Sequence, residues 1–185
     1  MTAYAAQSPL AVAANELDTT VGAAGQLRAQ VLLDRAHFSP GEIDGFAGSN
    51  QRRAVRGYQQ AKVLPVTGDL DAGTWAALNA DMAPVLVAYA LTVEDVGQNY
   101  ASLPQDMMEQ GKLKSLGFES IEEALGERFH ASPALLRKLN PTADFSKAGT
   151  RAAANTSPEP FSNWILSLGE DAFVITLGVI ALKDP

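Results

Sequence analysis

The sequence predicts a mainly α protein, α+β overall, in which a three-helix domain precedes a small α/β region. Two observations support this fold class. Apolar residues recur at helical spacing in three segments of residues 26–83, and clusters of Gly and Pro separate these segments. Farther along, residues 85–93 form a β-branched, aliphatic run typical of a strand. With 185 residues, the chain suits one domain or two small ones.

The first predicted helix covers residues 26–38. Its apolar positions fall at i, i+3, i+4 and i+7, which predicts one apolar stripe: Ala29, Leu32, Leu33 and Ala36. The turn Ser39-Pro40-Gly41 ends this helix, because the residue before a proline is pushed away from the α region. Residues 1–25 are rich in Ala, Thr and Gly, so we expect a disordered or weakly packed leader there.

The second and third helices are marked by spacing and by their starts. The apolar positions are Ala54, Val55, Tyr58 and Ala61 in the second helix, and Trp75, Leu78 and Met82 in the third. Ser49 or Asn50 is predicted to cap the second helix, and Asp71 the third. Gly57 lies in mid-helix, which indicates close approach of another group.

A set of residues across these helices falls in the order and spacing of one known family: Gln30, Leu33, Asp44-Gly45-Phe46, Gly48, Ala54-Val55, Tyr58-Gln59, Leu64-Pro65, Gly68, Asp71, Thr74-Trp75 and Leu78. In these positions the chain resembles the peptidoglycan-binding domain family. Similar modules accompany amidases, muramidases, spore-cortex lytic enzymes and L,D-transpeptidases. The chain departs from the family at Ala29, Gln51 and His37, where a larger aliphatic residue, a threonine and a glycine are common.

The resemblance implies peptidoglycan, as glycan strand or stem peptide, as the partner, and a periplasmic or extracellular location. We expect a shallow groove between the turn at residues 44–48 and the second and third helices. The candidate ligand-binding residues are Asp44, Gly45, Phe46, Arg52, Arg56, Tyr58 and Trp75. Aromatic faces suit sugars or methyl groups, and arginines suit carboxylates. Structural alternatives stay open: a turn role for Asp44, core packing for the aromatics, and a solvated face for the arginines, including Arg53.

Residues 84–154 are expected to form a LysM-like α+β domain. Asp106 and the residues after it fit a short helix behind Pro104, Ser120-x-x-Glu123 is a capping box, and Ser132-Pro133 begins a further helix. The run at residues 123–150 resembles the helical half of a LysM module, and similar sequence follows a peptidoglycan-binding domain in some L,D-transpeptidases. Residues 151–154 look poor as a closing strand, so an unrelated helical pair is the alternative. Residues 155–185 are predicted to be a linker and a C-terminal strand segment.

Composition narrows the possible partners. A net charge of −7 and a pI near 4.8 argue against nucleic acid and anionic membranes, which attract clustered Lys and Arg. The apolar run at residues 172–182 is too short to span a bilayer, so no membrane insertion is expected. No signal peptide is evident, although Ala3-Tyr4-Ala5 has the form of a cleavage site. We expect a monomer.

The sequence points away from catalysis. The chain has no cysteine, so it lacks the thiolate with which L,D-transpeptidases attack the stem peptide. No metal-ligand or serine-hydrolase motif is present, no cofactor is expected, and both His37 and His130 are interpreted as helix-end residues. The favoured hypothesis is a non-catalytic peptidoglycan-binding module that targets a murein-modifying enzyme. The alternatives are a divergent hydrolase or transglycosylase with its site in residues 84–185, and a purely structural interaction domain.

Overall fold

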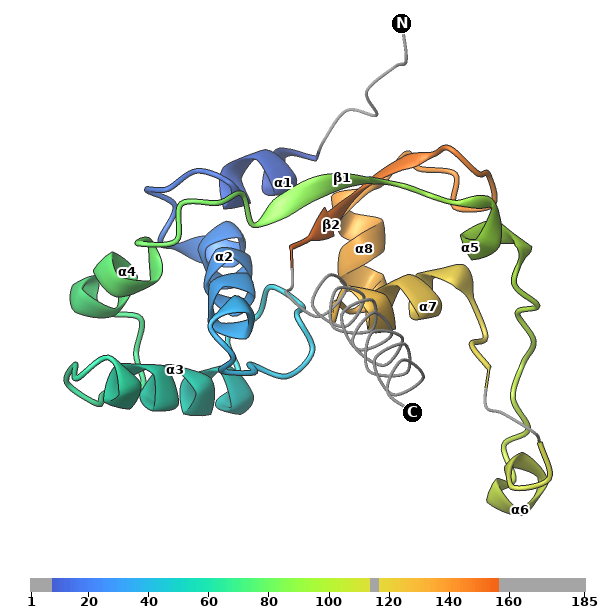
Figure 1. The fold of residues 1–185 in the computed structure, drawn as a ribbon, viewed down its shortest axis with the longest axis horizontal. Coiled ribbons are helices and arrows are strands. Elements are labelled where there is room, and N and C mark those ends of the chain that lie inside the picture. Colours follow the sequence, from blue (N-terminus) through green and yellow to red (C-terminus); the bar gives the residue numbers. More distant parts are fainter. Residues whose placement is uncertain (1–7, 114–116, 157–185) are drawn as a thin grey trace, which may run out of the picture.

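The computed structural model describes residues 8–113 and 117–156 of the chain. In this part the fold is mainly helical with one two-stranded sheet, as predicted (Figure 1). The first module, as we name it, holds α1 (Pro9–Ala14), α2 (Gly22–Arg35), α3 (Ser49–Ala61) and α4 (Ala72–Leu78). The second module holds β1 (Leu86–Ala90), α5 (Val93–Gly97), α6 (Met107–Gln110), α7 (Ile121–Arg128), α8 (Pro133–Leu139) and β2 (Arg151–Asn155). The strands predicted beyond residue 156 lie outside the described residues.

Helix α2 is the centre of the first module and is buried on all sides. The sequence predicted a single apolar stripe, but Leu27 and Val31 are buried as fully as Leu33. Polar side chains on the same helix are buried too: Arg28, Gln30 and Asp34. The prediction was too narrow because helices and loops cover α2 from several directions, whereas a surface helix buries one face only.

The buried polar groups of α2 hold its neighbours by hydrogen bonds. The guanidinium of Arg28 is fully buried and donates to the side chain of Asn79, at the end of α4, from Nε at 3.0 Å and Nη2 at 2.9 Å. Its Nη1 donates to the carbonyl of Ala14 in α1. Arg35 pairs with Asp81 and donates to the carbonyl of Pro84 at 3.2 Å. Helix α2 thereby ties α1, α4 and the start of the second module together.

The expectation of a disordered or weakly packed leader is wrong for helix α1, Pro9–Ala14, whereas Leu17 and Val21 after it are exposed. Ser8 caps helix α1, and Ala11 and Ala14 are fully buried in the common core. Asn15 exchanges two hydrogen bonds with the backbone of Leu86 in β1, at 3.0 and 2.9 Å. Small side chains allow this helix to approach its neighbours closely, which a pattern of large apolar residues would not reveal.

Three helices end in the same way, with a residue other than glycine at positive φ. His37, Val63 and His130 have φ of 64°, 57° and 50° and follow α2, α3 and α7. After α2, the N–H of Phe38 donates to the carbonyl of Leu33, as in a Schellman motif. Both histidines are therefore helix-end residues, as predicted, and the positive φ of His37 explains why glycine is common at that family position.

Gly57 is a site of close approach, as its mid-helix position indicated. A Cβ atom there would lie 3.1 Å from the ring of Phe38, which packs edge-to-face on Tyr58 with ring centroids 5.6 Å apart. The glycine lets the Phe38 ring lie directly on α3.

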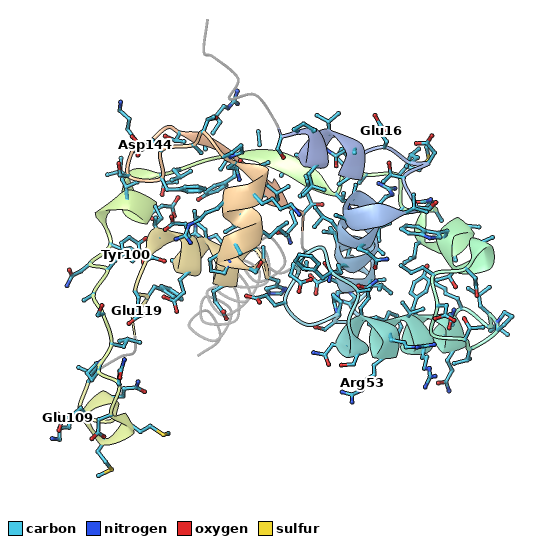
Figure 2. The ribbon with its side chains drawn as sticks, turned by 180° about the vertical axis from the view of Figure 1, so that it is seen from behind. Glu16, Arg53, Tyr100, Glu109, Glu119 and Asp144 are labelled. Atoms are coloured by element: carbon cyan, nitrogen blue, oxygen red, sulfur yellow. The ribbon has the colours of Figure 1, made fainter. Side chains whose placement is uncertain are left out.

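In the second module, β1 and β2 pair antiparallel over their whole length, from Leu86 opposite Asn155 to Ala90 opposite Arg151. Residues 151–154 are thus a strand, which corrects the expectation from their composition. Their alanines are buried between β1 and α8, so burial rather than β-propensity selects the extended state. Thr92 ends the predicted strand early, because it opens α5 with a capping box. Helix α6 stands apart from the core, as the position of Glu109 shows (Figure 2).

The two modules share one continuous core. Ile43, fully buried, forms a short parallel bridge with Ala131: its N–H donates to the carbonyl of His130 at 2.7 Å, and its carbonyl accepts from Ser132 at 2.9 Å. The ring of His130 lies 3.2 Å from the carboxylate of Asp34 in α2. Residues 26–83 therefore do not stand alone, because α1 packs on them from one side and α7–α8 contact them from another.

Asp95 is the buried acid of the second module. Its carboxylate accepts from the Tyr89 hydroxyl and from the Thr92 backbone N–H, and it pairs with Arg128 at 2.7 Å. Burial alone would raise the pKa of Asp95, but these hydrogen bonds and the nearby guanidinium together lower it below its ordinary value. The network fastens α5 to β1 and α7.

We predict that Trp75→Ala unfolds the first module. Trp75 is 6% exposed, and truncating a buried aromatic costs about 3–5 kcal/mol, a large part of the stability of a small domain. Thermal melting followed by circular dichroism should show a lower or lost transition. Ala76→Ser, at an exposed position of the same helix, is the control and should leave Tm almost unchanged. A Trp75→Ala protein with the wild-type Tm would contradict the core role.

We also predict that Asp95→Asn lowers stability by roughly 1.5–3 kcal/mol at neutral pH, the range for hydrogen bonds to a charged group. Because the pKa of Asp95 is lowered on folding, its contribution is complete above the ordinary value of 3.8 and is lost as pH falls through the folded-state value. Denaturant unfolding at several pH values should show the wild type and variant converging in acid. Exposed Glu94→Gln is the control, and a constant difference at all pH values would contradict the linkage.

Candidate functional site

The first module carries a cleft of about 430 Å³ between the start of α3 and the turn that precedes α4. Helix α2 contributes Gln26 to its lining; Figure 1 shows α2, α3 and α4. The lining residues are Gln26, Ala47, Gly48, Ser49, Gln51, Arg52, Val55, Gly68, Asp69 and Leu70. The cleft occupies part of the region where the sequence predicted a groove.

One wall of the cleft is the uncapped N-terminus of α3. The sequence predicted Ser49 or Asn50 as the N-cap, but Gly48 takes that position with φ −145° and ψ 175°, and no side chain among the described residues caps the helix. Ser49 and Asn50 instead belong to the first helical turn. The backbone N–H groups and the positive end of the helix dipole at this wall suit an anion or a carbonyl oxygen.

Gln51 forms the floor beside this wall. Its side chain is 4% exposed, and its Nε2 donates to Oε1 of Gln26 at 2.6 Å. Its Oε1 has no hydrogen-bond partner among the described residues. The burial of this oxygen keeps it away from the open space of the cleft.

The opposite wall is a turn built around Gln59. This side chain is fully buried, accepts from the N–H of Gly68 at 2.8 Å, and donates to the carbonyl of Asp69 at 3.0 Å and to Oγ1 of Thr74 at 2.8 Å. Asp71 then caps α4, as predicted, by accepting from the Thr74 N–H at 2.8 Å. That hydrogen bond, with the one from the Thr74 hydroxyl, lowers the pKa of Asp71.

Two arginines of α3 lie at the rim. Arg52 lines the cleft and pairs with Asp69 at 3.1 Å, both side chains being more than half exposed. Arg56 lies over the turn, since a Cβ atom on Gly68 would be 2.8 Å from its Nε. Arg53, also on α3, points away from the molecule (Figure 2). The rim thus combines cationic groups with a single carboxylate.

Asp44 and Gly45 form a structural turn outside the cleft. Gln30 accepts from the N–H of Gly45 at 2.7 Å and donates to the carboxylate of Asp44 at 2.9 Å. The same carboxylate accepts from the N–H of Phe46 at 2.8 Å, and Gly45 has a φ of 77° that favours glycine. The turn brings Ala47 and Gly48 to the cleft but contributes no ligand-facing group of its own.

The predicted aromatic contacts need correction. Tyr58 and Trp75 are 3% and 6% exposed and pack in the core, as expected for residues at helical spacing, so neither lines the cleft. Burial raises the pKa of the Tyr58 hydroxyl. Phe46 is 65% exposed but lies beside α8, with Nζ of Lys138 5.6 Å from its ring centroid.

Sequence reasoning missed Gln26, Gln51 and Asp69. The sequence contained a signal for Gln51: this polar residue falls on the apolar helical face of Ala54, Val55 and Tyr58. The others come together only when α2, α3 and the turn pack.

The module that contains the cleft matches the model of a known family. Residues 27–78 match the family model described as "Putative peptidoglycan binding domain". This match covers α3, α4 and the larger part of α2, and it agrees with the resemblance deduced from the sequence. Residues 141–185 match a second model, described as a domain of unknown function (DUF4126). A search of curated proteins found no match for the chain.

A second hollow of about 570 Å³ lies between the first and second modules and is lined by Glu42, Glu123, Glu127 and His130, among others. In the described part of the chain, no cluster of three His, Asp or Glu side chains is arranged to hold a metal ion. None of the helices described there has the length and apolar character needed to cross a membrane.

We predict that Gly68→Ala lowers the free energy of unfolding, because it strains the turn that forms one wall of the cleft. Gly68 has a φ of 79°, and an added Cβ would collide with Arg56 and touch Arg52; a left-handed L-residue costs roughly 1–2 kcal/mol. Gly73→Ala is the matched control: it lies in α4 with only an ordinary contact, and helix propensity predicts a gain of about 1 kcal/mol. Chemical denaturation should shift the two midpoints in opposite directions, and a shared direction would contradict the assigned geometry.

Proposed function

We propose that this protein binds peptidoglycan through the cleft of its first module and acts as a non-catalytic cell-wall targeting protein. One observation supports this proposal above all: the family match at residues 27–78 lies in the same module as the cleft. The proposed binding groups are Arg52 and Arg56 at the rim and the N–H groups of the α3 start.

The chemistry of the cleft suits this polymer. Peptidoglycan offers carboxylates and amide N–H groups on its stem peptides and acetamide groups on its sugars. Guanidinium groups recognise carboxylates, and the first turn of a helix accepts anions or carbonyl oxygens at its N–H groups. The rim therefore gives the protein a local cationic surface although the whole chain has a net charge of −7.

The second module is proposed to be LysM-like. Its order of strand, two helices and strand, with β1 and β2 paired antiparallel and α7 and α8 packed together, supports this interpretation. The segment with α5 and α6 is inserted between β1 and α7. A LysM-like module next to a peptidoglycan-binding module would strengthen wall attachment, because linked sites raise the effective concentration of each other.

The proposed location is the cell wall, periplasmic or extracellular, where the protein, as a monomer, would hold a murein-modifying enzyme of the L,D-transpeptidase type against its substrate. Such an arrangement explains why binding groups, rather than a nucleophile with its base, are gathered in the first module.

The test is incubation of the full chain with purified sacculi, followed by centrifugation and analysis of the soluble fraction. We expect the protein in the pellet and no soluble muropeptides. Protein that stays in the supernatant contradicts the proposal, and release of muropeptides would favour a hydrolase. The double variant Arg52→Ala, Arg56→Ala should weaken pelleting roughly tenfold through lost charge-assisted hydrogen bonds. Arg53→Ala, whose side chain points away from α3, is the matched control.

A further inference from the structure

One edge of the two-stranded sheet is left open by the described residues. Along a strand of an antiparallel pair, the backbone groups of alternate residues point to the partner strand and away from it. Leu91 exchanges hydrogen bonds with the backbone of Gly149 and Thr150, just before β2, so its groups point to the β2 side. The groups of Leu86 point away from β2, because both bond to the side chain of Asn15.

This alternation directs the N–H and carbonyl groups of Ala88 and Ala90 away from β2. Neither residue has a hydrogen-bond partner for these groups within residues 8–113 and 117–156. Ala88 is half-buried and Ala90 is exposed, so a partner can reach both. We call these backbone groups the open edge.

The opposite edge of the sheet is closed at its centre. The side chain of Asn140, at the end of α8, accepts from the N–H of Ala153 in β2 and donates to the carbonyl of the same residue at 3.0 Å. Edge strands are often protected by charged residues or Pro as well, but residues 85–91 contain neither. The open edge therefore keeps the groups that another extended chain needs for pairing.

Acidic side chains flank the open edge. Glu16 and Asp18 follow Asn15 at the start of β1, and Glu94 lies in the first turn of α5, just beyond its end (Figure 2). All three are exposed, and none is in an ion pair with a described residue. The cation Arg151 belongs to β2, one strand away from this edge. The flanking charges therefore favour a strand with a basic residue at each end, in either direction.

The same charges disfavour a second copy of this chain. Two β1 strands related by a two-fold axis would pair antiparallel, which brings the start of one strand beside the end of the other. Glu16 of each copy would then lie close to Glu94 of its neighbour, and like charges in such positions oppose pairing.

We propose that the open edge of β1 binds an extended segment of another protein by strand addition. The backbone of the segment exchanges hydrogen bonds with Ala88 and Ala90 and adds a strand to the sheet. An apolar side chain of the segment packs beside Val87, which is 38% exposed, and basic residues at its ends meet Glu16 and Glu94. This site belongs to the second module and is separate from the cleft, so the inference goes beyond peptidoglycan binding.

The first experiment uses the full chain, labelled with ¹⁵N, and follows hydrogen exchange of backbone N–H groups by NMR. In the free protein, the N–H groups of Ala88 and Ala90 should exchange at least about tenfold faster than those of Val87 and Tyr89, which point to β2. Slow exchange at Ala88 and Ala90 would mean that a second copy or the chain's own residues already occupy the edge, and would overturn the inference.

The second experiment adds the peptide acetyl-Lys-Val-Thr-Val-Thr-Val-Lys-amide, which we expect to slow exchange at Ala88 and Ala90. The same peptide with N-methyl groups on its five central residues should bind at least about tenfold more weakly, because its backbone cannot donate. A version with Glu in place of both Lys should bind roughly fivefold more weakly at low ionic strength. Failure of the Lys-ended peptide to bind, or equal binding of either matched peptide, would overturn the inference.

Substitutions at Ala90 test the edge from the side of the protein. Ala90→Pro removes an N–H of the open edge but no hydrogen bond to β2, so it should weaken binding of the Lys-ended peptide about tenfold. Ala90→Thr keeps this N–H and should bind within about twofold of the wild type. Thermal melting checks that both variants fold, and wild-type affinity of Ala90→Pro would contradict the proposal. Pelleting with sacculi should be the same for both variants, because the cleft lies in the first module.

The flanking charges are tested in the same assay. The double variant Glu16→Gln, Glu94→Gln should weaken binding of the Lys-ended peptide roughly fivefold and bind the Glu-ended peptide more tightly than the wild type does. Glu109→Gln is the matched control, since α6 stands apart from the core (Figure 2). An equal effect of the control and the double variant would contradict the assigned ends of the site.

Discussion

The burial of polar side chains along α2 is the constraint on which the rest of the structure depends. A helix surrounded by other elements cannot leave a guanidinium, a carboxamide and a carboxylate without partners, because each unpaired buried group costs free energy. These requirements are met by Asn79 at the end of α4 for Arg28, by the turn at residues 44–46 for Gln30, and by His130, which follows α7, for Asp34. Their partners are therefore fixed in place by the same bonds that satisfy α2.

Three buried glutamines of the first module differ in how many of their hydrogen-bonding groups are used. Gln30 and Gln59 each use both ends of the carboxamide to shape a turn around a glycine at positive φ. Gln51 uses its amide nitrogen, which donates to Gln26, while its oxygen is buried without a partner among the described residues. The turn around Gln59 forms one wall of the cleft, the turn around Gln30 lies outside it, and Gln51 packs beneath the cleft against Gln26.

The continuous core of the two modules has a consequence for binding. The bridge between Ile43 and Ala131 and the contact of Asp34 with His130 hold the loop before α3 against the second module. This loop leads directly into Gly48 and the start of α3. The second module thus helps to fix the position of the donors in the cleft, and preorganised donors bind a ligand with less loss of conformational entropy.

The sequence by itself determined the three-helix module, most helix starts, the helix-end histidines and the region of the cleft, because spacing, caps and turn residues act over a few positions. It did not determine the partners of α2, the pairing of residues 151–155 with β1, or the packing of α1, since these depend on burial by distant segments. The same holds for the site. Arg52 was recognisable from its place on α3, but Tyr58 and Trp75 proved to be core residues, and Gly48 replaced Ser49 as the N-cap. Only the tertiary structure placed the start of α3 at a cleft, because the cleft forms when α2, α3 and the turn before α4 pack together.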